Sequence, residues 1–174
     1  MPSILTRPLR EEHQQMRPRL EVLRRAADAV GHVPSGELAA LVDPAIAFVE
    51  SDLLPHSSAE TLVLYPVISK LTGSTRAAES IGDDHREIAR LSGDLAVLRA
   101  RLWLERPGDL DILRSVLYGL HSLALLHCSK EQDVLVPLLE EALREEDARE
   151  LFAAMDAAVA EARITAVVVL ETPS

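Results

Sequence analysis

The sequence of 174 residues has little of what several common protein classes require. A single cysteine excludes an internal disulfide, so a reducing cytosol is the expected compartment. Aromatic residues make up only 3% of the chain, while Leu, Ala, Val, Glu and Arg are abundant, and this composition favours helices over a β-sheet.

Long apolar runs and excess positive charge are also lacking. No run approaches the roughly 18 apolar residues of a membrane span, and the N-terminal segment has no signal-like apolar core. The formal net charge of −10 argues against nucleic acids and anionic membranes as partners. With 48% hydrophobic residues, we expect one soluble, cytoplasmic, untargeted globular domain over residues 1–174.

What is present is helical periodicity, interrupted by a few turn signals. Apolar residues recur at helical spacing, and turns at 31–36, 73–75 and 106–108 separate the segments. Thr6 and Asp109 are predicted to be N-caps of the first and fourth helices. The predicted helices cover about residues 7–30, 37–71, 76–105, 110–145 and 147–163.

Prolines inside these segments predict local distortion. Pro18 should kink the first helix, and Pro55 and Pro66 each remove an interior donor from the second helix, which should therefore bend. After the last helix, residues 164–170 are rich in β-branched side chains. This tail is compatible with a strand-like arm or with an interface element, and the sequence leaves both open.

The main feature of the chain is a pair of His-x-x-x-Glu motifs. His56 precedes Glu60, His127 precedes Glu131, and the two motifs are 71 positions apart. On a helix this spacing places both side chains of a motif on one face, one turn apart. One such pair is weak evidence because it often occurs by chance, whereas two pairs in register are much stronger evidence.

The repeat extends beyond the two motifs. The prolines that follow them, Pro66 and Pro137, are also 71 positions apart. The single histidines His13 and His85 are 72 positions apart, and each follows two acidic residues. The chain therefore contains two copies of one unit, a helix with one His followed by a helix with His and Glu.

Short loops make consecutive helices antiparallel neighbours. This predicts an all-α, up-down four-helix bundle over residues 5–145, with an additional C-terminal helix and tail over 147–174. Each of the four repeat histidines lies about 17 to 20 residues from a loop at the same end, so the histidines should reach one level of the bundle. The groups predicted to converge there are His13, His56, Glu60, His85, His127 and Glu131.

Six such groups in one layer point to a metal site. The alternative is a set of ordinary half-buried polar residues at helix seams, but burying four His and two Glu without a metal would be costly. The economical arrangement is two metal ions bridged by the two carboxylates, with two His each. Imidazole and carboxylate ligands without a thiolate suit iron or manganese better than structural zinc.

This ordered set of residues resembles the hemerythrin-like, or HHE cation-binding, domains over about residues 5–145. The resemblance implies a hemerythrin-like bundle with two iron ions in a non-haem centre, which handles a small molecule such as O₂, peroxide or NO. The residues that carry it are His13, His56 to Glu60 followed by Leu64-Tyr65-Pro66, His85 after its acids, and His127 to Glu131 followed by Val136-Pro137.

The chain also departs from the oxygen-carrying hemerythrins. Those proteins have a second His four residues after the helix-three His, where this chain has Ala89, and a five-residue His-to-Asp step where it has Glu131. It is therefore similar to bacterial hemerythrin-like proteins with fewer histidines, whose roles are more varied. Three functions remain open: a small-molecule binding or sensing module, a peroxide-consuming or other oxidoreductase, and a purely structural bundle.

The other polar candidates have simpler interpretations. His32 is predicted to be solvated in its loop. His121 is predicted to serve packing, with a role beside the metal ligands as the alternative. Cys128 is predicted to be a buried, inert thiol, with redox involvement as the alternative. Tyr65 either donates a hydrogen bond to a ligand at the centre or closes the core with its hydroxyl at the rim. The acidic residues preceding the two single histidines are interpreted as solvated, with orientation of an imidazole N–H as the alternative.

Overall fold

The computed structural model describes residues 5–104 and 106–171, except for the side chains of residue 77 and of residues 166–171. Every element in this part of the chain is helical, as predicted. The α-helices are α1 (Arg7–Ala29), α2 (Ser35–Phe48), α3 (Leu54–Ala59), α4 (Tyr65–Thr72), α5 (Arg76–Arg101), α6 (Asp109–Lys130), α7 (Val136–Ala142) and α8 (Glu145–Glu171). Three further segments are π-helical, namely η1 (Val49–Leu53), η2 (Glu60–Leu64) and η4 (Glu131–Leu135). Segment η3 (Leu102–Leu104) is a 3-10 helix.

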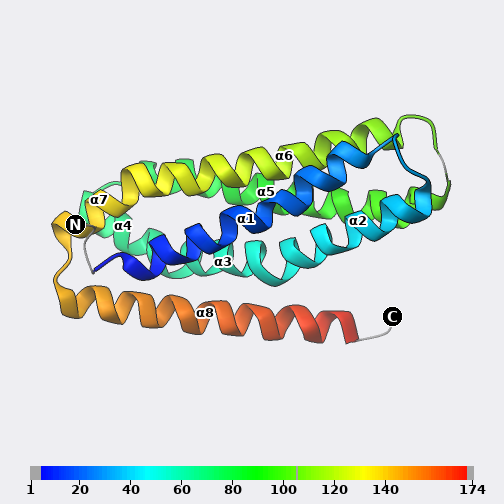
Figure 1. The fold of residues 1–174 in the computed structure, drawn as a ribbon. Helices are drawn as coiled ribbons and strands as arrows, with labels where there is room; N and C mark the ends of the chain where they lie inside the picture. The colour runs from blue at the N-terminus through cyan, green and yellow to red at the C-terminus, as the bar shows by residue number, and fades with distance from the viewer. Residues whose placement is uncertain (1–4, 105, 172–174) are drawn as a thin grey trace.

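The helices lie side by side along a common direction (Figure 1). The chain passes without interruption from α2 through α4 and from α6 through α7, because η1, η2 and η4 join the α-helices end to end. Helix α1 packs against α2 and α6, and α5 packs against α6, α4 and α2. Helix α8 lies along the outside of this group, against α3 and the η segments on either side of it.

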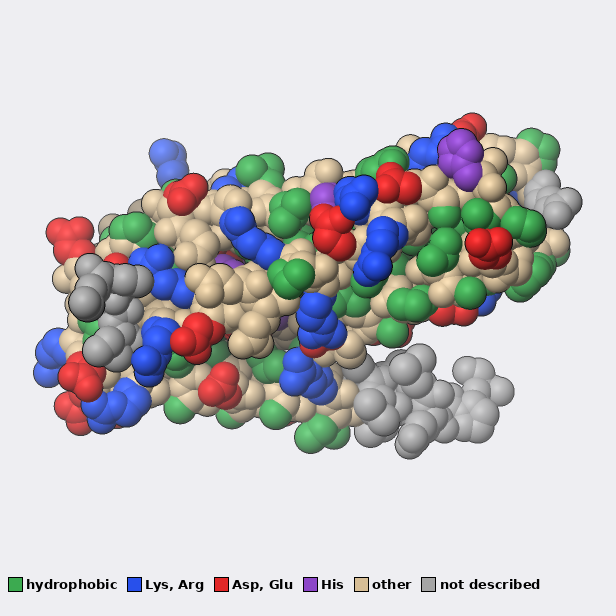
Figure 2. Space-filling model, in the orientation of Figure 1, with side chains coloured by type: hydrophobic (Ala, Val, Ile, Leu, Met, Phe, Trp, Pro, Cys, Tyr) green, Lys and Arg blue, Asp and Glu red, His purple; other side chains and the backbone are tan. Residues whose placement is uncertain are grey.

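The apolar faces of the helices form two separate clusters. One cluster includes Leu20, Leu95 and Leu117, and the other includes Leu9 and Ile68. The four helical runs that carry the predicted site residues are α1, α2 through α4, α5, and α6 through α7. In each run, the apolar residues before the site residues belong to one cluster and those after them to the other. The polar layer therefore lies between two apolar cores, while basic and acidic side chains are interspersed over the outer face seen in Figure 2.

Three prolines in the second and fourth runs each follow a π-helical segment, whereas Pro44 lies inside α2. Segments η1, η2 and η4 end two residues before Pro55, Pro66 and Pro137. The N–H that closes each segment bonds to the carbonyl five residues earlier, instead of four. Because proline has no N–H and its ring crowds the preceding turn, widening that turn lets the helix continue. The expected distortion is thus a π turn, whereas α1 continues through Pro18 as one α-helix.

Three details at the helix ends differ from the prediction. Thr6 occupies the N-cap position of α1, but its hydroxyl donates to Glu140 instead of capping the helix. The N-cap position of α6 is Gly108, whose φ of 83° lies in the left-handed region that glycine tolerates, and Asp109 is the first helical residue. Residues 164–170 continue α8, so their backbone is helical and not strand-like.

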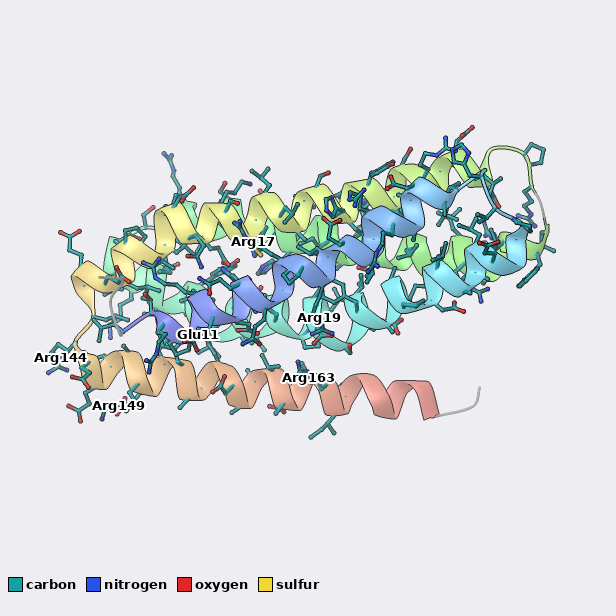
Figure 3. The ribbon with its side chains drawn as sticks, in the orientation of Figure 1. Glu11, Arg17, Arg19, Arg144, Arg149 and Arg163 are labelled. Atoms are coloured by element: carbon teal, nitrogen blue, oxygen red, sulfur yellow. The ribbon has the colours of Figure 1, made fainter. Side chains whose placement is uncertain are left out.

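Helix α8 is attached to the bundle by apolar and polar contacts. Phe152 and Met155 are buried in the same cluster as Leu9. Farther along, Nε of Arg163 donates to the carbonyl of Ser51 at 2.9 Å. Figure 3 shows Arg163 on the side of α8 that faces the bundle. The later part of α8 is therefore held against η1, which leads into the helix that carries the first His-x-x-x-Glu motif.

Candidate metal centre

The six predicted residues lie together between the two apolar cores, and each of the four long helical runs contributes to them. None is more than 7% exposed. They are His13 on α1, His56 on α3, Glu60 on η2, His85 on α5, His127 on α6 and Glu131 on η4.

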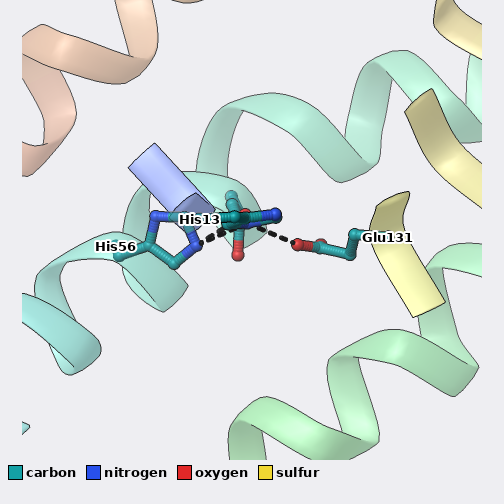
Figure 4. Close-up of side chains that lie close together, drawn as sticks. His13, His56 and Glu131 are labelled. Atoms are coloured by element: carbon teal, nitrogen blue, oxygen red, sulfur yellow. Dashed lines mark hydrogen bonds and ion pairs between the residues drawn. The ribbon is translucent and has the colours of Figure 1, made fainter. Parts of the chain in front are cut away.

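On one side of the centre, two imidazoles face the two carboxylates. The Nε2 atoms of His13 and His56 are 3.3 Å apart, and their rings are inclined at 73° (Figure 4). Nε2 of His56 lies 2.9 Å from Oε1 of Glu60. Nε2 of His13 lies 3.3 Å from Oε2 of Glu131 and 3.6 Å from Oε1 of Glu60. Four potential donor atoms thus converge at one point.

The other side repeats this arrangement with the second pair of imidazoles. The Nε2 atoms of His85 and His127 are 2.9 Å apart, and Oε2 of Glu60 lies 3.2 Å and 3.5 Å from them. Oε2 of Glu131 lies 3.5 Å from Nε2 of His127. The hydroxyl of Tyr65 donates to Oε1 of Glu131 at 3.1 Å and is 3.1 Å from Nε2 of His85. Tyr65 therefore reaches the centre, not the rim.

The donor atoms fit the binding of cations. They form two sets, each with two histidines and both glutamates, in which one atom from every residue lies within 4.8 Å of the others. Oε1 of Glu60 and Oε2 of Glu131 are buried without a hydrogen-bond partner. A buried carboxylate oxygen without a donor is unfavourable. A cation among these atoms would satisfy the oxygens and would be bound by unprotonated imidazole nitrogens.

The electrostatics of the metal-free centre lead to the same conclusion. Burial opposes protonation of His56, but the charge of Glu60 and the nearby Glu12 outweigh it and raise the pKa of His56 well above its ordinary value. Burial also opposes ionisation of Glu60, yet the imidazoles around it, that of His56 first, hold its pKa well below the usual range. Burial and the charge of Glu60 raise the pKa of Glu131. Positive charge among these groups is therefore favourable.

For two of the acids beside the single histidines, the structure favours the alternative interpretation, proximity to an imidazole, over a purely solvated position. Oε1 of Glu12 lies 3.0 Å from Nδ1 of His56, and Oδ2 of Asp84 lies 3.6 Å from Nδ1 of His127. The physical reason is that successive residues on a helix point about 100° apart, so only one acid of each pair can face a neighbouring helix. Glu12 and Asp84 are 72 positions apart, and the repeat could have revealed them.

Two further residues near the imidazoles carried a signal that the sequence-based prediction did not use. Oγ1 of Thr61 lies 2.8 Å from Nδ1 of His85, and the side-chain amide nitrogen of Gln132 lies 3.0 Å from Nδ1 of His13. Thr61 and Gln132 directly follow the two motif glutamates and are 71 positions apart. The repeat therefore includes them as well.

The remaining candidates lie outside the centre or are inert. His121 is close to Glu21, with Nε2 and Oε1 3.4 Å apart, and His32 is exposed. Cys128 is buried, and burial raises the pKa of its thiol to about 12, so the reactive thiolate is not populated near neutral pH.

A comparison with protein families supports this picture. The model of the hemerythrin HHE cation binding domain matches residues 5–139, which include all six residues of the centre. The chain belongs to the hemerythrin HHE family. No curated protein and no solved structure gave a match to the chain. The HHE match ends within α7, so α8 lies beyond it. Among the described helices, none is both long enough and apolar enough to span a membrane.

Proposed function

We propose that this HHE protein holds two iron ions in a non-haem, carboxylate-bridged centre and there binds or reacts with O₂, peroxide or NO. Manganese or another divalent metal is the alternative occupant. The ligands in this proposal are His13, His56, Glu60, His85, His127 and Glu131.

The observation that carries the proposal is the way in which the two halves share the carboxylates. Glu60 turns Oε1 toward His13 and His56 and Oε2 toward His85 and His127. A carboxylate with one oxygen for each pair of imidazoles is suited to bridging two cations. Bound iron would supply a Lewis acid and an electron donor for small oxidants.

The proposal includes the scaffold and the cellular setting. We propose a single domain, with an up-down four-helix bundle over residues 5–145 and an additional helix and tail over 147–174. We propose action in the cytoplasm, without a nucleic-acid or membrane partner. The net charge of −10 and the interspersed surface charges support this setting.

Peroxide consumption by an oxidoreductase is a second candidate, and Tyr65 is the observation that favours it. Burial, with the charges of Glu60 and Glu131, raises the pKa of the Tyr65 hydroxyl, so this group keeps its proton. The hydroxyl is a buried donor only 3.1 Å from a proposed metal-binding carboxylate. It can therefore hold a proton beside an oxygen atom of a small molecule at the centre.

Metal content tests the proposed function directly. Protein loaded with Fe(II) under anaerobic conditions should contain two irons per chain, and Glu131→Ala should lose a large part of that iron because both donor sets include Glu131. His121→Ala is the matched control, since His121 is a partly buried imidazole on α6 outside the centre. Wild-type protein without bound iron or manganese after loading would exclude the proposal. Sustained peroxide turnover by the loaded protein would favour the oxidoreductase over the binding module.

A further inference from the structure

All four imidazoles have the same orientation relative to the centre. Each directs Nε2 toward the carboxylates and presents Nδ1 to a residue outside the group of six. The residues that meet the four Nδ1 atoms form an outer layer, which consists of Glu12, Thr61, Asp84 and Gln132.

The outer layer follows the repeat of the chain. Glu12 and Asp84, which each precede a single histidine, approach the motif histidine of the same repeat. Thr61 and Gln132, which each follow a motif glutamate, contact the single histidine of the other repeat. Each pair of imidazoles therefore has one carboxylate and one uncharged partner behind it. Thr61 and Gln132 are within hydrogen-bonding geometry of their imidazoles. Glu12 and Asp84 are instead paired with theirs by charge, because Nδ1 of His56 and Nδ1 of His127 have no hydrogen-bond partner.

Thr61 shows how such a partner determines the orientation of the ring. Its hydroxyl donates its one proton to the carbonyl of Ser57 at 2.8 Å. The same oxygen is 2.8 Å from Nδ1 of His85 and can therefore only accept a hydrogen bond from it. The proton of His85 is then on Nδ1, and the lone pair on Nε2 faces the centre. This is the tautomer that binds a metal through Nε2.

The two outer carboxylates differ in their surroundings. Nζ of Lys130 donates hydrogen bonds to both carboxylate oxygens of Asp84, at 2.8 Å and 3.0 Å. The positive charge of Lys130 therefore largely neutralises the charge of Asp84. In the described part of the chain, no Lys or Arg forms an ion pair with Glu12, whose side chain is 38% exposed. Glu12 is also nearer its imidazole than Asp84 is, at 3.0 Å against 3.6 Å. A carboxylate behind an imidazole makes the ring a stronger metal ligand, and a neutralised carboxylate does so less.

We infer that Glu12, Thr61 and Asp84 are positioning residues for the imidazoles that they face, and that Lys130 makes the two metal positions unequal. The position of His13 and His56 binds a divalent ion more tightly than the position of His85 and His127. This inference rests on the proposed function, since it assumes that both positions bind metal.

Titration of the metal-free protein with Co²⁺, followed by visible absorption, tests the inference. Wild-type protein should bind two ions in two resolved steps. Glu12→Gln should weaken the tighter step and Asp84→Asn the weaker step, each by roughly 10- to 100-fold. Lys130→Met should strengthen the weaker step, so that the two steps approach each other. Unfolding of every metal-free variant is measured in parallel, because a purely structural role would change the melting temperature but would not select one step.

The neighbouring acids provide matched controls. Glu11→Gln and Asp83→Asn also remove one negative charge one position away, but the side chains of Glu11 and Asp83 are 58% and 65% exposed. They pair with Arg7 and Arg86. Both controls should leave both steps unchanged. If Glu12→Gln and Asp84→Asn bind Co²⁺ as these controls do, the inference is wrong although the metal centre stands. Wild-type protein that binds no Co²⁺ would instead refute the proposed function, and the inference with it.

Discussion

At the scale of single residues, Ala89 is the position where this chain most clearly departs from oxygen-carrying hemerythrins. The structure places Ala89 on the exposed side of α5, whereas the adjacent Ile88 is fully buried. The inward stripe of α5 thus continues from His85 to Ile88 and not to Ala89. A side chain at position 89 consequently points away from the centre.

We therefore predict that Ala89→His leaves the iron content unchanged, because the added imidazole would face solvent. Oxygen uptake by the anaerobically reduced protein should likewise be the same in the variant and the wild type. Metal analysis and absorbance spectra before and after sparging with nitrogen measure the two properties. An additional reversible spectral change in the variant alone would show that the ring does reach the centre.

At the scale of secondary structure, the π turns place Glu60 and Glu131 at equivalent points of the two repeats. Each glutamate is the first residue of a π segment that precedes a proline. The sequence predicted distortion at these prolines, because proline lacks a donor. It did not predict π turns, since a missing N–H can be accommodated by a bend, a break or a wider turn. Which of these occurs depends on the packing of neighbouring helices.

Arg163 provides a side-chain donor for a backbone carbonyl whose usual helical donor is missing. The carbonyl of Ser51 would normally accept from the N–H four residues later, but that residue is Pro55. Arg163 on α8 donates to this carbonyl at 2.9 Å. Its second contact is to Asp52, at 3.4 Å, and Asp52 also pairs with Arg19 of α1.

We predict that Arg163→Ala lowers the free energy of unfolding of the metal-free protein by about 1 kcal/mol, the usual value of one hydrogen bond at a partly exposed site. The loss should be smaller in a Pro55→Ala background, where a backbone donor is restored. Urea unfolding of the four proteins in this double-mutant cycle gives the comparison. Arg149→Ala is the control, because the ion pair that Arg149 forms among the described residues is with Glu145 of its own helix. Equal losses in both backgrounds would mean that Arg163 acts through Asp52 alone.

At the scale of the whole molecule, the sequence predicted the helices and the six converging residues because both depend on periodicity. Helical spacing determines which face a residue lies on, and the repeat aligned His13 with His85 and His56 with His127. Periodicity does not determine contacts between helices, and for this reason the sequence favours solvated positions for Glu12 and Asp84 and leaves contact with an imidazole as the alternative. Nor does it determine where α8 packs, because that depends on which outer face of the bundle remains apolar.

The same convergence gives the metal-free protein a distinctive dependence on pH. Burial opposes protonation of His13, His56 and His127, but the glutamates outweigh it and raise the pKa of all three. A histidine whose pKa is raised by folding stabilises the folded state when it is protonated. This stabilisation is fully present below the pKa of the unfolded chain, about 6.5, and it is lost as the pH rises through the pKa of the folded state. The lowered pKa of Glu60 acts in the opposite sense, since its contribution is present above its unfolded pKa and is lost only in stronger acid.

The metal-free protein should therefore lose stability as the pH rises above about 6.5, where protons begin to leave the imidazoles and the ionised carboxylates remain buried. A bound divalent ion replaces those protons, and it binds better as they leave. We predict that the gain in melting temperature on metal loading is larger at pH 8 than at pH 5.5. Thermal unfolding of loaded and metal-free protein at both values measures it. In Glu60→Gln, which lacks the shared carboxylate, both the pH dependence and the gain should shrink. A gain that is equal or smaller at pH 8 in the wild type would mean that protons and metal do not compete for the same six side chains.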